Sequence, residues 1–334
     1  MDCITRSCKV CNEKTTGFNY GVQSCNACKM FFRRALDTPK VLKCGRDGNC
    51  PTIVLDSGES QCRFCRFHKC IIVGMIFLDA VDDPTNIINK LLVMDTKRRD
   101  IFLNCTIPES LTVDEVFSRR SFPFEPRKPG TVFNFCDWGV INHLSCISFI
   151  RQLDFIKFLS SQDTIAIFKY SHLMYLILVT AMRSYLCKEA AMNHPGKVDV
   201  FPEEAQYAAG YNKQLLNDIR CLLVGRLSEI KITHEEFILL SVIILCNPGA
   251  TNLSKSGRII LASNQERFSS ILLHYCLITN SKCGPARFNE ILSLCHVVSR
   301  TLSDLDNLTC LYSLVHTVPA PPNLFNNILK FLLH

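Results

Sequence analysis

Apolar residues recur at helical spacing through most of the chain beyond Gly130, and no alternating strand pattern persists there. The two most apolar runs, residues 173–182 and 237–246, are each about ten residues long. Runs of this length are too short to span a bilayer, which needs about 20 apolar residues in a row. The pattern therefore predicts an all-helical domain whose central helices are buried, and it predicts no membrane partner.

The pattern upstream of this domain predicts one more helix and then a loop. The helix begins at Asp83 and Pro84, an acidic N-cap followed by proline at the first helical position. Apolar residues follow at helical spacing as far as the basic triplet 97–99, which we interpret as a solvated helix end rather than a nuclear import signal. Residues 107–130 contain several prolines and lose the periodicity, so they are predicted to form a loop.

The N-terminal region carries two short amphipathic helices. In the first, which begins after Cys25, the core side consists of Cys28, Phe31, Phe32 and Ala35. The opposite side is mostly polar and basic and holds Asn26, Lys29, Met30, Arg33 and Arg34. The second helix is predicted over residues 61–72, with Phe64, Phe67 and Ile71 on one side. Two helices of this size can bury their aromatic sides against each other.

Eight cysteines in the same region fall into two sets of four. The first set is Cys8, Cys11, Cys25 and Cys28, and the second is Cys44, Cys50, Cys62 and Cys65. Four thiolates held in two close pairs make a tetrahedral zinc site, and a structural site of this kind has no open position for chemistry. The spacing predicts two zinc ions that supply much of the folding free energy of a small module.

The alternative to zinc is a disulfide framework, which requires an oxidising compartment and a signal peptide. Residues 1–6 have no apolar core of that kind, and the ten cysteines beyond residue 78 show no close pairs. These features favour reduced thiols inside the cell. Cys3, His68 and Cys70 remain as alternative ligands, although Cys70 is most simply a small buried apolar residue.

The positive charge of the chain is concentrated in the cysteine-rich region. Residues 1–78 contain 12 Lys or Arg and 6 Asp or Glu, whereas the net charge of the whole chain is +7. Lysine and arginine on an exposed helix face suit phosphates and the guanine edge in the major groove of DNA. Release of counterions from the phosphates would drive such binding. The region is therefore predicted to read double-stranded DNA.

Residues 8–75 resemble the DNA-binding domain of nuclear hormone receptors. The resemblance rests on Tyr20-Gly21-Val22, on the run from Cys28 to Arg34 and on the close at residues 69–75. Asn26-Ala27, Met30 and the long loop of the second zinc set are most similar to the expanded nematode branch of that family. The resemblance implies a recognition helix that bears Asn26, Ala27, Lys29, Met30 and Arg33. It also implies phosphate contacts from Tyr20, Arg34, Arg66 and Lys69.

Two departures from the family pattern stand out in this region. The second set has eleven residues, 51–61, where the family usually has nine. Closing a loop longer by two residues costs only about a few tenths of a kcal/mol, so we expect the second site to form. Asn26, Ala27 and Met30 replace the residues of better-studied receptors at the specificity positions, which leaves the DNA half-site open. Acidic Asp79, Asp82 and Asp83 follow Met75 where monomer-binding receptors extend basic residues, so we expect binding as a dimer or weak binding as a monomer.

The helical domain resembles the ligand-binding domain of the same family, more faintly. The segment from Phe149 to Ile156, together with 159–164 and 167–169, is similar to the family signature, which joins the third and fourth helices. His274-Tyr275 and the helix over 287–315 resemble the dimerisation region. The resemblance implies a three-layer helical sandwich, an unknown small lipophilic ligand, homo- or heterodimers with another nuclear receptor, and coregulator proteins as partners.

The C-terminus departs from the family pattern for coactivator binding. Family members clamp a peptide helix between a basic residue on the third helix, here Arg151, and an acidic residue on the last helix. No Asp or Glu follows Asp306, and Phe331 stands where the acid is expected. An acid there would pair with the helix N-terminus of the peptide. We therefore hypothesise that the chain does not activate through this clamp.

The sequence thus predicts an orphan receptor of the nematode type that acts in the nucleus on RNA polymerase II transcription. The predicted parts are a DNA-binding domain over 5–80 with zinc fingers at 8–28 and 44–70, a hinge helix over 81–99, and a ligand-binding domain over 100–334. Two other classes are considered. A LIM- or RING-type protein-contact module does not explain the basic helix. An enzyme needs a catalytic constellation, and no His-Glu-x-x-His, Gly-x-Ser-x-Gly or glycine-rich phosphate loop appears.

Overall fold

The computed structural model describes most of the chain. The described residues are 6–37, 42–46, 50, 62–75, 83–107, 111–119, 121–201, 206, 213–315 and 324–333. The chain divides into two compact units. One consists of Met1–Asp82, Leu153–Ala166 and Pro248–Asn264, and the other of Asp83–Gln152, Ile167–Asn247 and Gln265–His334.

The cysteine-rich region contains two small hairpins and two helices. Strands β1 (Arg6–Ser7) and β2 (Lys14–Thr15) pair antiparallel, as do β3 (Phe18–Asn19) and β4 (Val22–Gln23). Helix α1 spans Asn26–Asp37 and helix α2 spans Arg63–Ile72. The rings of Phe32 on α1 and Phe67 on α2 stack at 5.6 Å, and both side chains are fully buried. The prediction that the two helices bury their aromatic sides against each other is confirmed.

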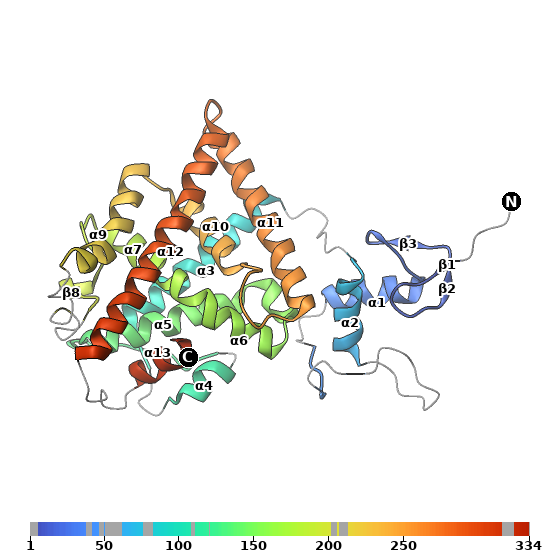
Figure 1. The fold of residues 1–334 in the computed structure, drawn as a ribbon, viewed down its shortest axis with the longest axis horizontal. Helices are drawn as coiled ribbons and strands as arrows, with labels where there is room; N and C mark the ends of the chain where they lie inside the picture. The colour runs from blue at the N-terminus through green and yellow to red at the C-terminus, as the bar shows by residue number, and fades with distance from the viewer. Residues whose placement is uncertain are drawn as a thin grey trace. The chain divides into compact units, whose positions relative to one another are not determined.

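The rest of the described chain is almost entirely helical, as predicted (Figure 1). Its α-helices are α3 (Pro84–Asn104), α4 (Val113–Ser118), α5 (Phe135–Gln152), α6 (Ser161–Tyr170), α7 (His172–Leu186), α9 (Lys213–Ile230), α10 (His234–Leu245), α11 (Lys255–Thr279), α12 (Gly284–Val315) and α13 (Leu324–Leu333). Two short 3-10 helices lie at Asp154–Phe158 and Pro195–Lys197. Two small hairpins pair β5 (Cys105–Thr106) with β6 (Glu125–Pro126) and β7 (Asn193–His194) with β8 (Val198–Asp199).

Helix α7 forms the middle of the second unit. It packs against α5 on one side and against α9, α10 and α12 on the others, while α3 covers α5 and α10. Most of its residues are buried, including the large side chain of Tyr175. Helix α10 is buried over nearly its whole length as well. The two apolar runs therefore form buried core helices, as their length predicts.

None of the described helices alone is long and apolar enough to cross a bilayer. Helices α6 and α7 reach the necessary length and apolar composition only together, as a pair bent by 48°.

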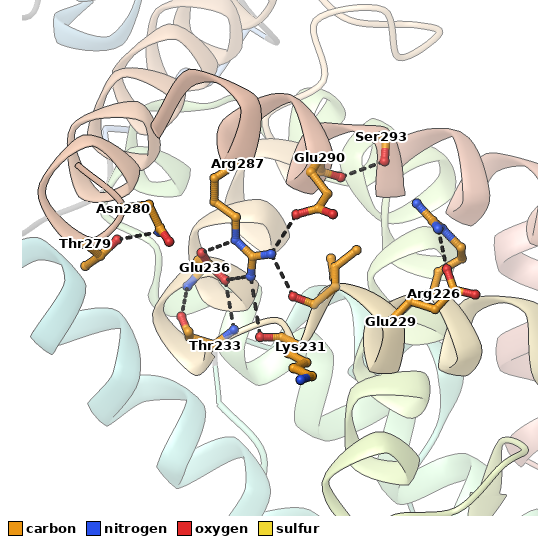
Figure 2. A network of polar contacts seen from close by, with 11 residues as sticks. Arg226, Glu229, Lys231, Thr233, Glu236, Thr279, Asn280, Arg287, Glu290 and Ser293 are labelled. Carbon is orange, nitrogen blue, oxygen red and sulfur yellow. Dashed lines mark hydrogen bonds and ion pairs between the residues drawn. The ribbon is translucent and has the colours of Figure 1, made fainter. Parts of the chain in front are cut away.

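A buried ion pair fixes α12 to the start of α10 (Figure 2). Arg287 donates from Nη2 to Oε2 of Glu236 at 2.6 Å and from Nε to Oε1 at 2.8 Å. Glu236 is only 1% exposed, and it also closes a capping box with Thr233 at the N-terminus of α10. A third nitrogen of Arg287, Nη1, donates to the Ile230 carbonyl at the end of α9. One guanidinium therefore joins three helices.

The structure corrects the predicted end of the helix that begins at Pro84. Asp83 caps it as expected, because its side chain accepts a hydrogen bond from the Thr85 amide. The helix, however, runs on to Asn104, and Arg98 is 6% exposed instead of solvated. Arg98 Nε donates to Oδ1 of buried Asp95 at 2.7 Å. A paired guanidinium can be buried because its partner neutralises the charge, so the basic triplet does not mark the end of the helix.

The predicted loop over 107–130 also contains regular structure. Thr112 and Glu115 form a reciprocal capping box that begins α4, and β6 pairs with β5. Helix α4 is six residues long, too short to be stable alone. Its Val116 is fully buried, so packing against other helices stabilises it.

Helix α13 docks on α5 through a glycine. A β-carbon at Gly139 would lie 2.4 Å from the ring of Phe325, closer than any side chain allows. The bare backbone of Gly139 lets the Phe325 ring approach α5, where it also meets Phe135 edge to face at 5.1 Å. Ile328 and Leu332 of α13 are buried as well. The last helix is thus part of the core of the second unit.

Candidate zinc centres and nucleic-acid interface

The first cysteine set converges on one point beside the start of α1. Cys8 follows β1, Cys25 precedes α1 and Cys28 lies in the first turn of α1. The four sulfur atoms of this set all lie within 4.8 Å of one another, and the Cys11 and Cys25 sulfurs are 3.6 Å apart. Zinc–sulfur bonds of about 2.3 Å in a tetrahedron place sulfurs about 3.8 Å apart. The cluster therefore has the dimensions of a four-thiolate zinc site.

The second set converges in the same way at the start of α2. The sulfur of Cys44 lies 3.6 Å from that of Cys50 and 3.5 Å from that of Cys65, and Cys62 completes the group within 4.8 Å. Cys62 is also the N-cap of α2, because its sulfur accepts a hydrogen bond from the Cys65 amide. The long loop over 51–61 lies outside the described residues, and the flanking Cys50 and Cys62 both belong to this cluster.

The surroundings of the sulfurs suit thiolates bound to a cation. Amides donate to sulfur in both sets, from Cys28 to Cys25 and from Cys65 to Cys62, each at 3.4 Å. Burial raises the pKa of the Cys28 and Cys65 thiols above the ordinary value. A dication at the centre reverses this preference by stabilising the thiolates. Both sites are closed four-sulfur sites, so they hold zinc for structure rather than for catalysis.

Helix α1 presents the predicted DNA-reading residues to solvent. The exposed residues are Asn26, Ala27, Lys29, Met30, Arg33 and Arg34. The residues predicted for the core side, Cys28, Phe31, Phe32 and Ala35, are all buried. Because Cys25 and Cys28 belong to the zinc site, the metal anchors the helix at its first turn. The result is a rigid basic face of the size that enters a DNA groove.

Of the residues predicted to contact phosphate, Arg34 is exposed on α1, whereas Tyr20, Arg66 and Lys69 are half-buried. Tyr20 adopts a positive φ of 53° and meets the ring of Phe32 edge to face at 4.9 Å. Arg66 and Lys69 lie on α2. Arg66 donates from Nη2 to the Cys28 sulfur at 3.3 Å, and its guanidinium lies 4.4 Å from the centre of the Phe31 ring.

No pattern in the sequence predicts this contact between Arg66 and Cys28. The two residues are 38 positions apart, and the only local signal was an arginine one residue after a ligand cysteine. Such a hydrogen bond to a ligand atom orients the ligand and tunes the metal. Arg66 therefore supports the first zinc site from the helix of the second.

Neither Cys70 nor His68, two of the alternative zinc ligands, belongs to the sulfur clusters. Cys70 is fully buried among apolar side chains, as predicted for a small apolar residue. His68 is buried and stacks on the ring of Phe64 at 3.9 Å. Cys3 lies outside the described residues.

A cavity of about 190 Å³ opens in the second unit between α3, α7 and the β7–β8 hairpin. Its lining combines apolar side chains with the charged residues Asp95, Arg98, Arg99, Arg183 and Glu189. The Arg183 guanidinium donates to the Asn193 carbonyl at 2.8 Å. Burial lowers the pKa of Arg183 to about 10. His194 also lines the cavity, is 4% exposed and has no hydrogen-bond partner for Nδ1 among the described residues. The volume is below the roughly 300–1,000 Å³ of drug-sized sites.

Arg151, the basic residue expected to hold a coactivator, is engaged within the chain. It lies near the end of α5 and donates from Nη2 to the Val116 carbonyl of α4 at 2.8 Å. Phe331 of α13 stacks on Phe117 of α4 with 3.9 Å between ring centres. Arg151 and Phe331, the two residues at the expected clamp positions, therefore both contact α4.

Two four-sulfur sites under an exposed basic helix, joined to an all-helical domain, define a zinc-dependent DNA-binding transcription factor. Residues 6–77 match the double treble clef zinc finger of C4 type, and residues 120–311 match the ligand-binding domain of nuclear hormone receptor. The chain is 37% identical to nuclear hormone receptor family member nhr-27 of Caenorhabditis elegans, over 99% of this chain and 94% of that protein.

Other relatives match over similar lengths. The C. elegans family members nhr-9 and nhr-167 are 35% and 34% identical, and each match covers more than nine-tenths of both chains. The chain belongs to the nuclear hormone receptor family. Members of this family are transcription factors and not enzymes. The predicted family, fold class and zinc cofactor are thereby confirmed.

Proposed function

We propose that the chain is an orphan nuclear receptor that binds specific double-stranded DNA sites in the nucleus and regulates transcription by RNA polymerase II. The observation that carries the proposal is the exposed basic face of α1, whose first turn lies inside a four-sulfur site. In this proposal the eight clustered cysteines each bind zinc. Base contacts come from Asn26, Ala27, Lys29, Met30 and Arg33, and phosphate contacts from Tyr20, Arg34, Arg66 and Lys69.

The experiment is selection of bound sequences from random duplex DNA with the zinc-loaded full chain. One enriched half-site, bound with affinity that falls steeply with salt, is the expected result. Binding without sequence preference, or binding to proteins but not to DNA, would contradict the proposal and favour a protein-contact module.

The domain boundaries and the dimeric state belong to the same proposal. We place the DNA-binding domain at 5–80, the hinge helix at 81–99 and the ligand-binding domain at 100–334. Acidic Asp79, Asp82 and Asp83 follow the DNA-binding domain, and they would repel phosphate beside a single half-site. The chain therefore binds DNA as a homodimer or as a heterodimer with another nuclear receptor, through the 32-residue helix α12. Tight binding of a monomer to one half-site would contradict this.

The ligand of the helical domain is proposed to be a small lipophilic molecule with one polar end. The support is the cavity beside Arg183, whose walls are mainly apolar while its guanidinium and the His194 ring can meet a polar group. Octanoate serves as a probe and 1-octanol as its uncharged control. Octanoate should raise the melting temperature of the full chain, and Arg183→Met should abolish the shift.

Regulation is proposed to proceed without the usual coactivator clamp, because no acid follows Asp306 and Arg151 is engaged by α4. Repression, ligand-independent behaviour and activation through a partner are each consistent with this. The test is a fusion of residues 100–334 to a neutral DNA-binding domain. Strong reporter activation that requires both α13 and Arg151 would contradict the proposal.

A further inference from the structure

Helix α4 lies on a surface that is built to bind a helix. The surface is formed by Arg151 of α5, Phe168 of α6 and Phe331 of α13. Helix α4 packs directly against α13 (Figure 1). The Phe117 ring of α4 stacks on Phe331 and meets Phe168 edge to face at 5.7 Å. Leu111, just before the helix, and Val116 within it are both buried. The contacts of α4 are thus mainly apolar, through the adjacent Val116 and Phe117 within the helix and Leu111 just before it.

Arg151 holds the C-terminal end of α4. The last carbonyls of a helix have no partner within the helix, and the Val116 carbonyl is one of them. Arg151 Nη2 fills this place at 2.8 Å, and its guanidinium also lies 5.5 Å from the Phe168 ring. A basic side chain at the end of a docked helix and apolar anchors along it form the recognition pattern for a peptide helix in a groove.

The fit of α4 to this surface is incomplete. Arg151 Nη1 is buried and has no hydrogen-bond partner among the described residues. A buried donor without a hydrogen-bond partner is destabilising. A longer helix that offers a second free carbonyl to Arg151 would remove this cost. Since a six-residue helix has little stability of its own, α4 can be exchanged for such a helix.

We propose that α4 is an intramolecular plug of the coregulator groove, and that an amphipathic helical peptide of a coregulator must displace it to bind Arg151. The plug masks the groove in the resting chain, so coregulator binding becomes a competition between two helices. The proposal rests on one part of the proposed function, namely that coregulator proteins are partners of the helical domain. It gives a reason why the usual clamp is not available in the resting chain, because α4 occupies Arg151. It does not depend on DNA binding.

The experiment uses the zinc-loaded full chain and a fluorescent peptide of Leu-x-x-Leu-Leu type. Phe117→Ser removes the central anchor of the plug without changing the groove, and Val132→Ser, at a side chain that is 90% exposed, is the matched control. Phe117→Ser should tighten peptide binding at least tenfold, while Val132→Ser leaves it unchanged. A folded Phe117→Ser protein that binds no better than the unsubstituted chain would overturn the proposal.

Hydrogen exchange of the unsubstituted chain tests the same point without a substitution. Excess peptide should speed exchange of the amides of 113–118, and a scrambled peptide should not. Peptide binding that leaves exchange at α4 unchanged places the peptide elsewhere and overturns the proposal. DNA binding measured on the same samples shows separately whether the proposed DNA-binding function holds.

Discussion

The guanidinium of Arg66 donates a hydrogen bond to the sulfur of Cys28 across 3.3 Å. Arg66 lies on α2, next to Cys65 of the second zinc site, whereas Cys28 belongs to the first. The two metal centres are therefore linked through one side chain. This link also stabilises the orientation of α1, because Cys28 is in its first turn.

Replacement of Arg66 should weaken the first zinc site. Loss of a partner that hydrogen-bonds a metal ligand typically costs about 10- to 100-fold in metal affinity. Arg66→Met should therefore speed zinc loss to a chelator by about tenfold for one of the two ions. Arg63→Met, at an exposed position on the same helix, is the control and should leave zinc release unchanged. Equal release from both variants would show that the hydrogen bond does not support the site.

Lys29 should carry sequence information, and Lys69 should not. Lys29→Ala should cost roughly 1–3 kcal/mol on the best DNA site and blur the base preference at one position. Lys69→Ala should weaken all sequences alike and reduce the salt dependence by about one phosphate contact. Both effects can be measured by titrating the full chain with matched and mismatched duplexes at several salt concentrations. An unchanged sequence preference after Lys29→Ala would show that α1 is not the reading helix.

Local periodicity and spacing predict the elements whose contacts are close in sequence. The two sides of α1, the buried helices α7 and α10 and the two cysteine sets follow from residues within a few turns of one another. Arg66 and Cys28 could not be paired in this way, since helical geometry says nothing about which side chain another helix brings near.

Two departures of the fold from the sequence prediction have different causes. Arg98 can be buried because it pairs with Asp95, one turn earlier in the same helix. Asp95 also contacts His234 on α10, and no local sequence pattern predicts this long-range contact. Helix α4, in contrast, had a local signal. Thr112 and Glu115 show the Ser/Thr-x-x-Glu spacing of a capping box, which marks the start of a helix. The prolines of 107–130 nevertheless led to the prediction of a loop.

Loss of one partner from the buried pair of Arg287 and Glu236 should destabilise the helical domain strongly. Removal of one partner leaves a buried charge without compensation and costs about 3–5 kcal/mol. Arg287→Met should therefore lower the denaturation midpoint strongly, because the Glu236 carboxylate is 1% exposed. Arg300→Met is the control, since the Arg300 side chain is 61% exposed in its pair with Asp218, and such pairs contribute about 0–1 kcal/mol. Similar losses in both variants would contradict the assignment.

Buried histidines should make the helical domain sensitive to acid. Burial lowers the pKa of His143 to about 4. Its Nδ1 lies 2.9 Å from Nε2 of His172, whose pKa burial also lowers. In the unfolded chain the His143 imidazole has its ordinary pKa near 6.5. Below that pH the unfolded chain therefore binds a proton at His143, whereas the folded chain does not until the pH approaches 4. Stability from His143 is therefore complete above pH 6.5 and is lost as the pH falls toward 4, in total about 3 kcal/mol at 1.36 kcal/mol per pKa unit.

His143→Gln checks this expectation against the exposed control His296→Gln. Denaturation midpoints of both variants and of the unsubstituted chain should be measured from pH 7.5 down to 4.5, where zinc release affects all three proteins alike. The slope between pH 6.5 and 4.5 should flatten for His143→Gln only. The same slope in all three proteins would show that His143 does not titrate on unfolding.

Phe331 offers a way to separate the effect of the plug from that of the missing acid. Phe331→Gln removes the stacking on Phe117 and should loosen α4 without adding charge. Phe331→Glu removes the same contact and also supplies a carboxylate for the N-terminus of a bound peptide helix, an interaction of about 0.3–1 kcal/mol. Both variants lose the same apolar part of the groove, so the comparison between them isolates the carboxylate. Phe331→Glu should bind a Leu-x-x-Leu-Leu peptide about two- to fivefold more tightly than Phe331→Gln. The Lys169 ammonium lies 5.0 Å from the centre of the Phe331 ring, so it would pair with the new carboxylate and reduce the gain in peptide affinity. Lys169→Ala in the Phe331→Glu background should therefore increase the peptide affinity. Equal peptide affinity of the two Phe331 variants would show that α4 alone limits access to the groove and that the absent acid has no part in it.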